Sequence, residues 1–574
     1  MFIRKAKIMI DLKGKPFYIS DEDIAWVENT LSTMNLTEKV GQLFCPIGIT
    51  DDEKVLKQIL DDIKPCGIMF RADEGRLVQK THRFLQDNSK IPLLIAANLE
   101  AGGNGTATDG TKYSNQMGVA AADDEDYAYK LGLIAGREGR AVGVNWAFAP
   151  VCDIDYNFHN PITNTRTYGS DPERVLRMAR SYMRGIHECG LTVSVKHFPG
   201  DGVDGRDQHL LTSVNSLSTD EWDESYGKVY KGMIEDGAMT FMVGHIMQPA
   251  YSRKLRPNIK DEEIMPATLS PELLNGLLRE KLGFNGLIVT DASLMAGFTQ
   301  AMRREDAVPY AIAAGCDVFL FNQDIQEDFE FMMNGIQRGI LTPERIDEAV
   351  TRILALKAAL KLHKQKEEGI LVPNEDALSI LQCEEHMKWA AECADKAVTL
   401  VKDTQSLLPI SPKKYKRVML YVLGDQEGFL GGMPISDEFI KLLQKEGFDV
   451  HKFDSTNIDF NLLMQPVNEF AKKYDLVIYL ANLETASNQT TVRITWTPPM
   501  GLDIPKYLNE VPVMFISVAN PYHLQDVPRV KTFINAYTSS PIVIKAVVDK
   551  IMGRSEFRGV SPIDPFCGYW EAKL

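Results

Sequence analysis

Lys196, His197, Asp207 and His209 stand within one stretch of the sequence, LTVSVKHFPGDGVDGRDQHL, at residues 191–210. The stretch opens with an apolar, β-branched run that predicts a buried strand, and it continues as a glycine-rich, acidic loop. Asp207 and His209 are two residues apart, so their side chains can face the same way in a turn. A carboxylate beside an imidazole fixes the tautomer of the ring and raises its pKa. The pair is therefore a candidate for general acid/base catalysis.

Asp291 is a second candidate, because it directly follows the apolar run in GFNGLIVTDASLMAGF, residues 283–298. A carboxylate at one strand end and a His/Asp pair in another loop supply the parts for two-step cleavage of a glycosidic bond. One group attacks the anomeric carbon, and the other protonates the leaving oxygen and then activates water. Another class of enzyme fits part of the pattern, since Lys196 at the end of its strand could form a Schiff base, as in a barrel aldolase.

The elements that must position these side chains recur as short apolar runs separated by stretches with helical periodicity. Eight strand-then-helix units over about 300 residues are typical of a (β/α)8 barrel, whose active site lies at the carboxyl ends of the strands. Polar side chains follow the predicted strands, as such a site requires. The predicted strands are Val40–Ile47, Gly67–Phe70, Pro92–Ala97, Asn145–Val151, Leu191–Val195, Met239–Val243, Gly286–Thr290 and Asp317–Phe321.

The domain organisation is predicted from where this pattern ends. We expect a (β/α)8 TIM-type barrel with an N-terminal arm over residues 1–362, a charged and Gly/Pro-containing linker over 363–375, and a C-terminal α/β sandwich domain over 376–574. The C-terminal part lacks a GxGxxG fingerprint, so a dinucleotide site is not expected. Its predicted strands are Val398–Val401, Val418–Leu423, Leu476–Leu480, Val511–Val518 and Thr532–Ala536.

Composition narrows the class of protein and of partner. The 574 residues carry a formal net charge of −15, which argues against nucleic acid as the main partner. The eight cysteines are scattered without paired spacing, and neither a signal peptide nor a membrane-spanning run is evident. We expect a cytoplasmic protein, monomeric or homodimeric, that binds a small carbohydrate and needs no cofactor and no metal.

Seven segments spread over most of the chain carry a family resemblance: KHFPGDG (196–202), DQH (207–209), FAPVCDIDYN (148–157), NPITNTRTYG (160–169), MVGHI (242–246), PATLSPELLNGLLREKLGFNGLIVTDASLM (266–295) and AVTLVKDTQSLLPI (397–410). Together they resemble glycoside hydrolase family 3, and within it the bacterial β-N-acetylhexosaminidase branch. The resemblance implies that Asp291 is the nucleophile of a covalent glycosyl-enzyme. It implies that His209, on a mobile loop, is the acid/base with Asp207 as its partner. The side chains expected to contact the sugar are Lys196, His197, Arg166, Asn98 and Met295.

The chain departs from the family pattern at two places. After the third strand the family usually reads Asp-Gln-Glu-Gly-Gly with an Arg shortly after, whereas this chain reads Asn-Leu-Glu-Ala-Gly at 98–102, with Thr106 near the Arg position. Those family residues hold the far hydroxyls of the non-reducing sugar, so the preferred sugar stays open. At residue 201 the branch usually has a second His, and this chain has Asp201.

The resemblance implies a retaining exo-β-glycosidase, expected to be a β-N-acetylglucosaminidase that hydrolyses terminal N-acetylglucosamine from short glycosides such as muropeptides or chitin oligomers. A β-glycoside phosphorylase or a β-glucosidase of the same family is an alternative, because a His acid/base does not repel phosphate as a Glu would. The Schiff-base lyase using Lys196 and a catalytically inactive sugar-binding protein are the alternatives from other classes.

Overall fold

The structure, a computed structural model, describes residues 10–426, 434–454, 464–485, 487–488, 490 and 493–574. The chain forms two compact units. The first comprises Met1–Thr111, Tyr129–Ile154 and Val175–Cys383, and the second comprises Lys112–Ala128, Asp155–Arg174 and Glu384–Leu574. Two segments that precede residue 362 thus belong to the second unit. The expected linker at 363–375 overlaps α15 (Leu362–Glu367) and the start of a 3-10 helix (Glu375–Ile380), both in the first unit.

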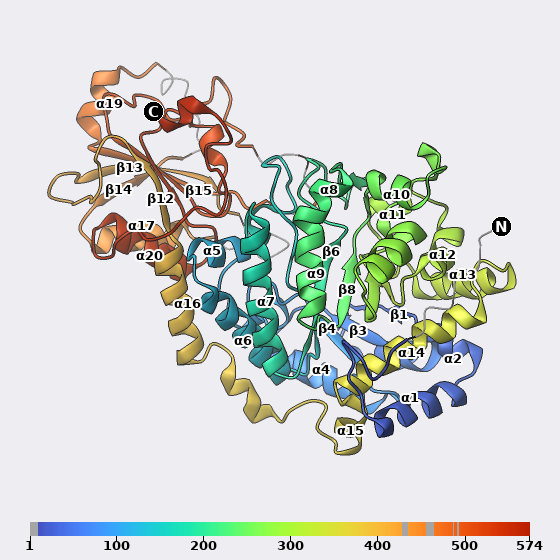
Figure 1. Cartoon of the computed structure of the whole chain (residues 1–574). Helices are drawn as coiled ribbons and strands as arrows, with labels where there is room; N and C mark the ends of the chain where they lie inside the picture. The colour runs from blue at the N-terminus through green and yellow to red at the C-terminus, as the bar shows by residue number, and fades with distance from the viewer. Residues whose placement is uncertain (1–9, 427–433, 455–463, 486, 489, 491–492) are drawn as a thin grey trace. The chain divides into compact units, whose positions relative to one another are not determined.

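The first unit is a barrel of eight parallel strands, the first of which is divided in two, with helices around it (Figure 1). A seven-stranded sheet runs in the order β10-β8-β6-β5-β4-β3-β2, and β1 pairs with β11. The ring closes because Val318 bridges Val289 and because the Cys66 N–H donates to the Phe44 carbonyl at 3.0 Å. The expected (β/α)8 barrel is confirmed. Its strands are β1 (Phe44–Cys45), β2 (Ile47–Gly48), β3 (Gly67–Phe70), β4 (Leu94–Ala97), β5 (Trp146–Ala147), β6 (Thr192–Phe198), β8 (Thr240–Val243), β10 (Leu287–Thr290) and β11 (Phe319–Leu320).

Each of the eight predicted apolar runs overlaps one of these strands, and the strands are shorter where proline intervenes. Pro46 separates β1 from β2, since proline has no N–H to donate to a ladder. Pro150 follows β5, and beyond it Val151 still bridges Lys196 on β6. Every residue of β6 is buried, as its β-branched sequence predicts.

The helices of the barrel begin at capping residues that the sequence supplies. The Ser20 side chain accepts from the Asp23 N–H at the start of α1, and Thr342 precedes Pro343 at the start of α14. Ser270 accepts from the Leu273 N–H at 3.3 Å, where a helix was expected. The helices are α1 (Asp21–Thr33), α2 (Leu36–Gly41), α3 (Glu53–Asp62), α4 (Gly75–Asp87), α6 (Glu125–Ala141), α7 (Pro172–Glu188), α8 (Thr219–Trp222), α9 (Lys228–Glu235), α10 (Pro249–Leu255), a π-helix (Glu272–Lys281), α11 (Ala296–Thr299), α12 (Arg304–Ala314), α13 (Ile325–Gln337) and α14 (Pro343–Ala359).

The second unit is an open six-stranded sheet in the order β12-β17-β16-β15-β13-β14, parallel except for β12. The five predicted strands are present. The sixth, β14, is an edge strand whose residues are mostly exposed, so it lacks the apolar run that marks the others. The strands are β12 (Thr399–Asp403), β13 (Arg417–Gly424), β14 (Asp449–Lys452), β15 (Leu476–Asn482), β16 (Val513–Ser517) and β17 (Thr532–Asn535).

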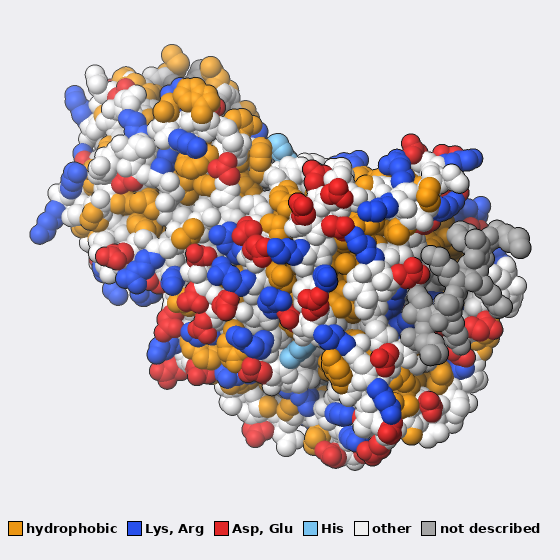
Figure 2. Space-filling model, viewed as in Figure 1, with side chains coloured by type: hydrophobic (Ala, Val, Ile, Leu, Met, Phe, Trp, Pro, Cys, Tyr) orange, Lys and Arg blue, Asp and Glu red, His pale blue; other side chains and the backbone are white. Residues whose placement is uncertain are grey.

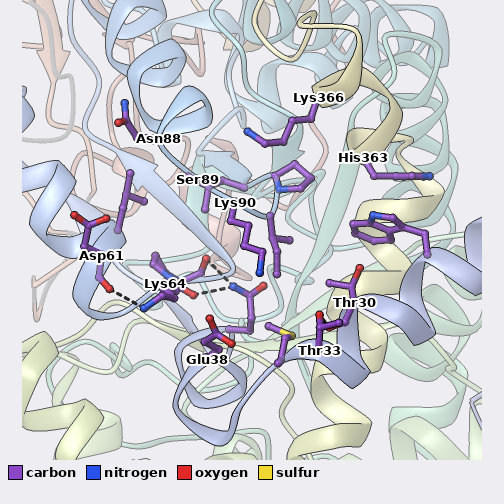
Figure 3. Close-up of a pocket in the computed structure, with 18 of the residues that line it drawn as sticks. Thr30, Thr33, Glu38, Asp61, Lys64, Asn88, Ser89, Lys90, His363 and Lys366 are labelled. Carbon is purple, nitrogen blue, oxygen red and sulfur yellow. Dashed lines mark hydrogen bonds between the residues drawn. The ribbon is translucent and has the colours of Figure 1, made fainter.

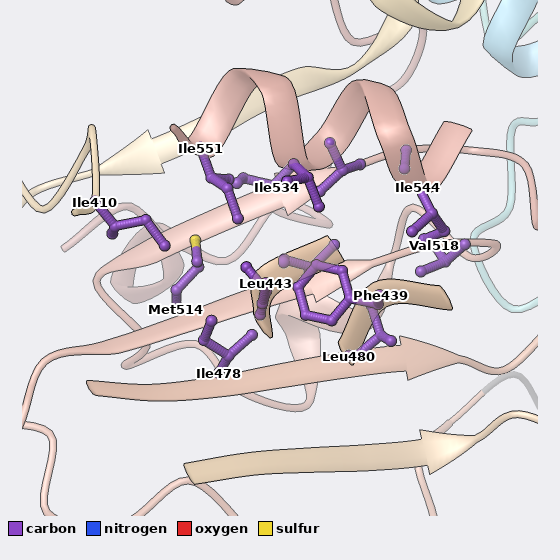
Figure 4. Packing of buried hydrophobic residues seen from close by; sticks show 14 of the residues in the cluster. Ile410, Phe439, Leu443, Ile478, Leu480, Met514, Val518, Ile534, Ile544 and Ile551 are labelled. Atoms are coloured by element: carbon purple, nitrogen blue, oxygen red, sulfur yellow. The ribbon is translucent and has the colours of Figure 1, made fainter. Parts of the chain in front are cut away.

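Apolar clusters cover both faces of this sheet. On one face, Phe439 and Leu443 of α17 and Ile544 and Ile551 of α20 pack on strand residues such as Ile478 (Figure 4). On the other face, α19 and irregular segments contribute a second cluster. This is the α/β arrangement with layers on both faces that was expected. The helices of this unit are α5 (Gln116–Ala121), α16 (Glu384–Ala397), α17 (Ser436–Lys445), α19 (Val467–Lys473) and α20 (Pro541–Ile551).

Acidic and basic side chains are interspersed over the face of the protein that Figure 2 shows. Among the described residues, no helix is long and apolar enough to cross a membrane. The eight cysteines are free thiols, five of them buried.

Candidate active site

Asp291 lies directly after β10, and strand pairing fixes its backbone. Its N–H donates to the Val243 carbonyl at 2.9 Å, at the end of neighbouring β8. Its carboxylate Oδ1 accepts from the Ala292 N–H at 2.7 Å, and Oδ2 lies 3.9 Å from His197 Nε2. The side chain is 13% exposed, so a small ligand can reach the carboxylate from the barrel mouth.

Opposing effects act on the pKa of this carboxylate. Burial raises the pKa of Asp291, but nearby imidazoles and the Ala292 N–H lower it by more, so the pKa lies below the ordinary value of 3.8. The imidazoles are those of His197, His245 and His209. Burial lowers the pKa of His245 itself, so that ring adds positive charge only in acidic solution. Asp291 is therefore ionised near neutral pH, as a nucleophile must be.

His197 is oriented by Asp153, which follows the fourth strand. The Asp153 carboxylate lies 2.7 Å from His197 Nδ1 and accepts from the His197 N–H at 3.1 Å. Because an ionised carboxylate can only accept, Nδ1 carries the hydrogen and Nε2 faces Asp291. The two side chains are buried, which holds the ring in one orientation.

Lys196 is held by an ion pair inside the barrel mouth. Its Nζ lies 2.7 Å from Glu100 Oε1, and the Lys196 side chain is 3% exposed. Glu100 comes from the segment after β4, where the chain departs from the family pattern. Although this segment differs from the family pattern, it keeps the Glu100 carboxylate, which pairs with the buried Lys196 ammonium.

His209 and Asp207 form a hydrogen-bonded pair. His209 Nδ1 lies 2.7 Å from Asp207 Oδ1, which also accepts the His209 N–H at 2.8 Å. Asp207 is buried, whereas the His209 side chain is 27% exposed and keeps Nε2 available. The loop before the pair needs glycine at residue 200, because φ is +114° and a Cβ would lie 2.2 Å from the Tyr226 ring.

Asn98 and Met295 also lie at the carboxyl ends of barrel strands. Asn98 follows β4 and is exposed, and Met295 follows Asp291 by four residues and is 5% exposed. Asn98, Met295, Lys196, His197, Asp207, His209 and Asp291 all belong to the first unit.

Arg166 belongs to the second unit, in the segment 155–174. It ends a 3-10 helix (Asn164–Arg166), and its Nη1 donates to the Ile162 carbonyl at 3.4 Å. The same segment is fixed by Asp155, whose carboxylate accepts from Thr163 Oγ1 at 2.6 Å and from the Tyr522 hydroxyl at 2.5 Å.

Sequence reasoning did not assign roles to Asp153, His245 or Gln208. His245 follows β8, its Nε2 donates to the Ala292 carbonyl at 2.9 Å, and its Nδ1 lies 3.0 Å from Thr268 Oγ1. Its place in the MVGHI segment at the end of a strand was the available signal. Apart from Asp201, which is seven residues from Gln208, their side-chain partners are distant in sequence, so these contacts depend on the folded barrel.

Figure 3 shows a separate cavity of about 460 Å³. Its walls include Gln42, Pro65 and Leu93, which come just before strands rather than after them. Its rim carries lysines and carboxylates in equal number, and none of the candidate site residues lines it. Among the described residues, no group of three or more His, Cys, Asp or Glu side chains is placed to hold a metal ion.

Known proteins match the chain over both of its parts. Residues 35–356 match the family model described as the glycosyl hydrolase family 3 N terminal domain. A "Beta-N-acetylglucosaminidase/beta-glucosidase" of Cellulomonas fimi is 47% identical over 574 residues, which are 99% of this chain and 100% of that protein. A "Beta-hexosaminidase A" of Pseudoalteromonas piscicida is 28% identical over 57% of this chain and 56% of its own length. The solved structure of "Beta-glucoside phosphorylase BglX" is 47% identical, with a TM-score of 0.92 over 98% of this chain and 99% of that one.

Proposed function

The chain belongs to glycoside hydrolase family 3, and we propose that it is a retaining exo-β-glycosidase that releases β-linked N-acetylglucosamine from the non-reducing end of short glycosides. The observation that carries the proposal is the ionised Asp291 at the barrel mouth, in the same unit as the hydrogen-bonded His209–Asp207 pair. The name of the Cellulomonas fimi relative, which includes both N-acetylglucosaminidase and glucosidase, supports this choice of sugars.

The two groups divide the chemistry of a retaining reaction between them. In the first step an Asp291 oxygen attacks the anomeric carbon while His209 Nε2–H protonates the leaving glycosidic oxygen, which leaves a glycosyl ester on Asp291. In the second step the neutral Nε2 removes a proton from water, and the water oxygen displaces Asp291 from the sugar. Asp207 accepts from Nδ1–H throughout, so the proton moves only at Nε2.

The remaining candidates have binding roles in this proposal. The Lys196 ammonium donates to sugar hydroxyls beside Asp291, the His197 ring forms hydrogen bonds to them through Nε2, and Met295 packs against the ring of the sugar. Asn98 contributes hydrogen bonds to hydroxyls or to the 2-acetamido group, and Arg166 remains a residue that the family resemblance predicts to bind a sugar hydroxyl. The contacts of Glu100 with Lys196 and of Asp153 with His197 hold these two side chains in fixed positions.

A screen of aryl β-glycosides of N-acetylglucosamine, glucose and xylose tests the proposed sugar. We expect the largest kcat/KM for N-acetylglucosamine and a smaller one for glucose. A preference for xylose, or equal values for glucose and N-acetylglucosamine, would contradict the assignment of the sugar while leaving the glycosidase reaction in place.

Phosphorolysis is a second candidate, and it is favoured by the 47% identity to a β-glucoside phosphorylase. A histidine acid/base carries no negative charge, so a phosphate ion can approach the glycosyl ester where a carboxylate would repel it. Turnover should be compared with and without phosphate, and the product should be identified as free sugar or sugar 1-phosphate by NMR. Acceleration by phosphate with formation of sugar 1-phosphate would establish this reaction.

The Schiff-base lyase is disfavoured by the contacts of Lys196. Its Nζ is held 2.7 Å from the Glu100 carboxylate, and this ion pair would have to break before the nitrogen could attack a carbonyl carbon. Borohydride should therefore fail to trap substrate on Lys196.

A further inference from the structure

Gln208 stands between Asp207 and His209 in sequence, and its side chain is completely buried. A buried amide is stable only when its hydrogen-bonding groups are satisfied. Oε1 accepts from the His245 N–H at 2.7 Å, and Nε2 donates to Asp201 Oδ2 at 3.3 Å. The Gln208 side chain therefore ties the loop to the end of β8 and to the loop that follows β6.

The backbone of the same loop is tied to the segment that follows the nucleophile candidate. The Gly297 N–H donates to the Gln208 carbonyl at 3.1 Å, and the Ala296 N–H donates to the His209 carbonyl at 2.9 Å. A Cβ at residue 297 would lie 2.7 Å from the Gln208 carbonyl oxygen, so the two segments approach as closely as glycine permits. The loop and the Asp291 segment thus form one packed surface.

Asp201 extends the connection to the other side of the site. Its carboxylate is buried and accepts from the Gly202 N–H at 2.8 Å, and its own N–H donates to Asp153 Oδ1 at 2.8 Å. Asp153 is the residue that orients His197. A continuous series of hydrogen bonds therefore runs from His197 through Asp153 and Asp201 to Gln208, which is covalently next to His209.

We propose that Gln208, through its hydrogen bonds to Asp201 and to the His245 backbone, is a positioning residue that holds the His209–Asp207 pair in its working place before substrate binds. The proposal rests on the proposed acid/base role of His209. The glycines of the loop permit motion, but the buried amide fixes the segment immediately beside the pair. A misplacement of about 1 Å in a catalytic group can cost roughly 10²-fold in rate. Loosening this amide should consequently impair proton transfer more than sugar binding.

The test compares the Gln208→Leu variant with the wild type, both as the full chain. The substrates are two β-glycosides of the same sugar, one with a dinitrophenyl and one with an alkyl leaving group. The alkyl glycoside needs protonation of the leaving oxygen, and the dinitrophenyl glycoside needs little. We expect kcat/KM, which reports only the first step up to the glycosyl ester, to fall by roughly 10²-fold for the alkyl glycoside and by less than about threefold for the dinitrophenyl glycoside. Activity on the dinitrophenyl glycoside also reports that the variant is folded.

Gln300→Ala is the matched control. The exposed Gln300 side chain donates to the Leu210 carbonyl of the same loop at 3.4 Å but does not contact Asp201 or His245. We expect this variant to keep the wild-type ratio of the two rates. If Gln208→Leu does not fold, the ratio of the two rates should be measured for Asp201→Asn instead. This variant keeps the shape of the side chain that Gln208 contacts, and its ratio then tests the inference.

Two results would overturn the inference. One is an equal loss on both substrates in folded Gln208→Leu, and the other is no loss on either. His209→Ala measured in parallel separates this failure from that of the acid/base assignment. If His209→Ala slows both glycosides equally, the proposed role of His209 fails. If His209→Ala slows the alkyl glycoside more but Gln208→Leu does not, the positioning role of Gln208 alone fails.

Discussion

The ionisation of Asp291 is governed by its neighbours, since burial by itself would favour the neutral acid. The His197 ring, held by Asp153, faces the carboxylate with Nε2 at 3.9 Å. The same carboxylate keeps one oxygen on the Ala292 N–H. At this scale the site sets the Asp291 carboxylate beside an imidazole whose orientation Asp153 fixes.

Asp291→Asn should lower turnover by at least roughly 10³-fold, because an amide is a poor nucleophile toward the anomeric carbon. A 2-deoxy-2-fluoro glycoside should label Asp291 in the wild-type protein, as peptide mass spectrometry can show. The pKa of Asp291 lies below 3.8, so the acidic limb of kcat/KM that it causes should lie below pH 3.8. Labelling of another carboxylate would refute the assignment.

His209→Ala should slow glycosides with poor leaving groups by about 10² to 10⁴-fold and spare activated aryl glycosides in the first step. Asp207→Ala should give a milder loss of the same kind, because the 2.7 Å contact that orients the His209 ring is lost. Steady-state and burst kinetics on a series of leaving groups measure both effects. An equal loss across the series would point to binding or folding instead.

The turn after β4 shows how an element places side chains at the barrel mouth. Gly103–Gly105 forms a single 3-10 turn that returns the chain toward the strand end. A Cβ at residue 105 would lie 1.7 Å from the Asn98 carbonyl oxygen, which no side-chain rotation can relieve. This close approach of backbone to backbone fixes the position of Asn98 and of the segment carrying Glu100.

Gly105→Ala should therefore displace this turn, weaken sugar binding and lower the melting temperature. Gly190→Ala is a useful comparison, because φ there is +77° and a Cβ meets nothing within 4 Å. That comparison variant should lose only about 1–2 kcal/mol of stability from backbone strain and keep its KM. Thermal unfolding and substrate KM distinguish the two variants. Equal effects on KM would contradict the proposed part of this turn in binding.

Over the whole molecule, the sequence predicted most of the fold because the folding signal is local. The eight apolar runs became the eight barrel strands, since parallel strands buried on both faces carry continuous apolar sequence. The edge strand β14 was missed because its exposed residues carry no such run. Within the site, Asp207 and His209 could be paired from their spacing. Asp153 and His197 are 44 residues apart, and only barrel closure brings them together.

The second unit should show a pH dependence of stability that originates at Asp155. Burial raises the pKa of Asp155 to about 6, although hydrogen bonds from Thr163, Tyr522 and the Asn164 backbone lower it. The folded state therefore holds this proton more tightly than the unfolded state, whose Asp pKa is about 3.9. The stabilisation by this group is largest below pH 4 and is lost as the pH rises through about 6.

Asp155→Asn should remove this dependence. The difference in unfolding free energy between the wild type and Asp155→Asn should then fall between pH 4 and pH 7, by an amount on the order of 1.4 kcal/mol for each unit of pKa shift. Denaturant unfolding at several pH values measures it. A difference that stays constant or grows with pH would show that Asp155 is not the group responsible.

The interleaved course of the chain limits how the protein can be cut and recombined. Met117 and Ala121 come from within the first third of the sequence, yet they pack with Ala397, Tyr537 and Ile563 of the second unit. A fragment ending at residue 383 would retain the first two side chains and lose their apolar partners. We expect such a fragment to aggregate on expression, and a monodisperse, active fragment would disprove this. Swapping whole catalytic barrels between relatives at a single splice point should fail for the same reason, so chimaeras of this protein require at least the segments 112–128 and 155–174 to travel with the C-terminal sequence.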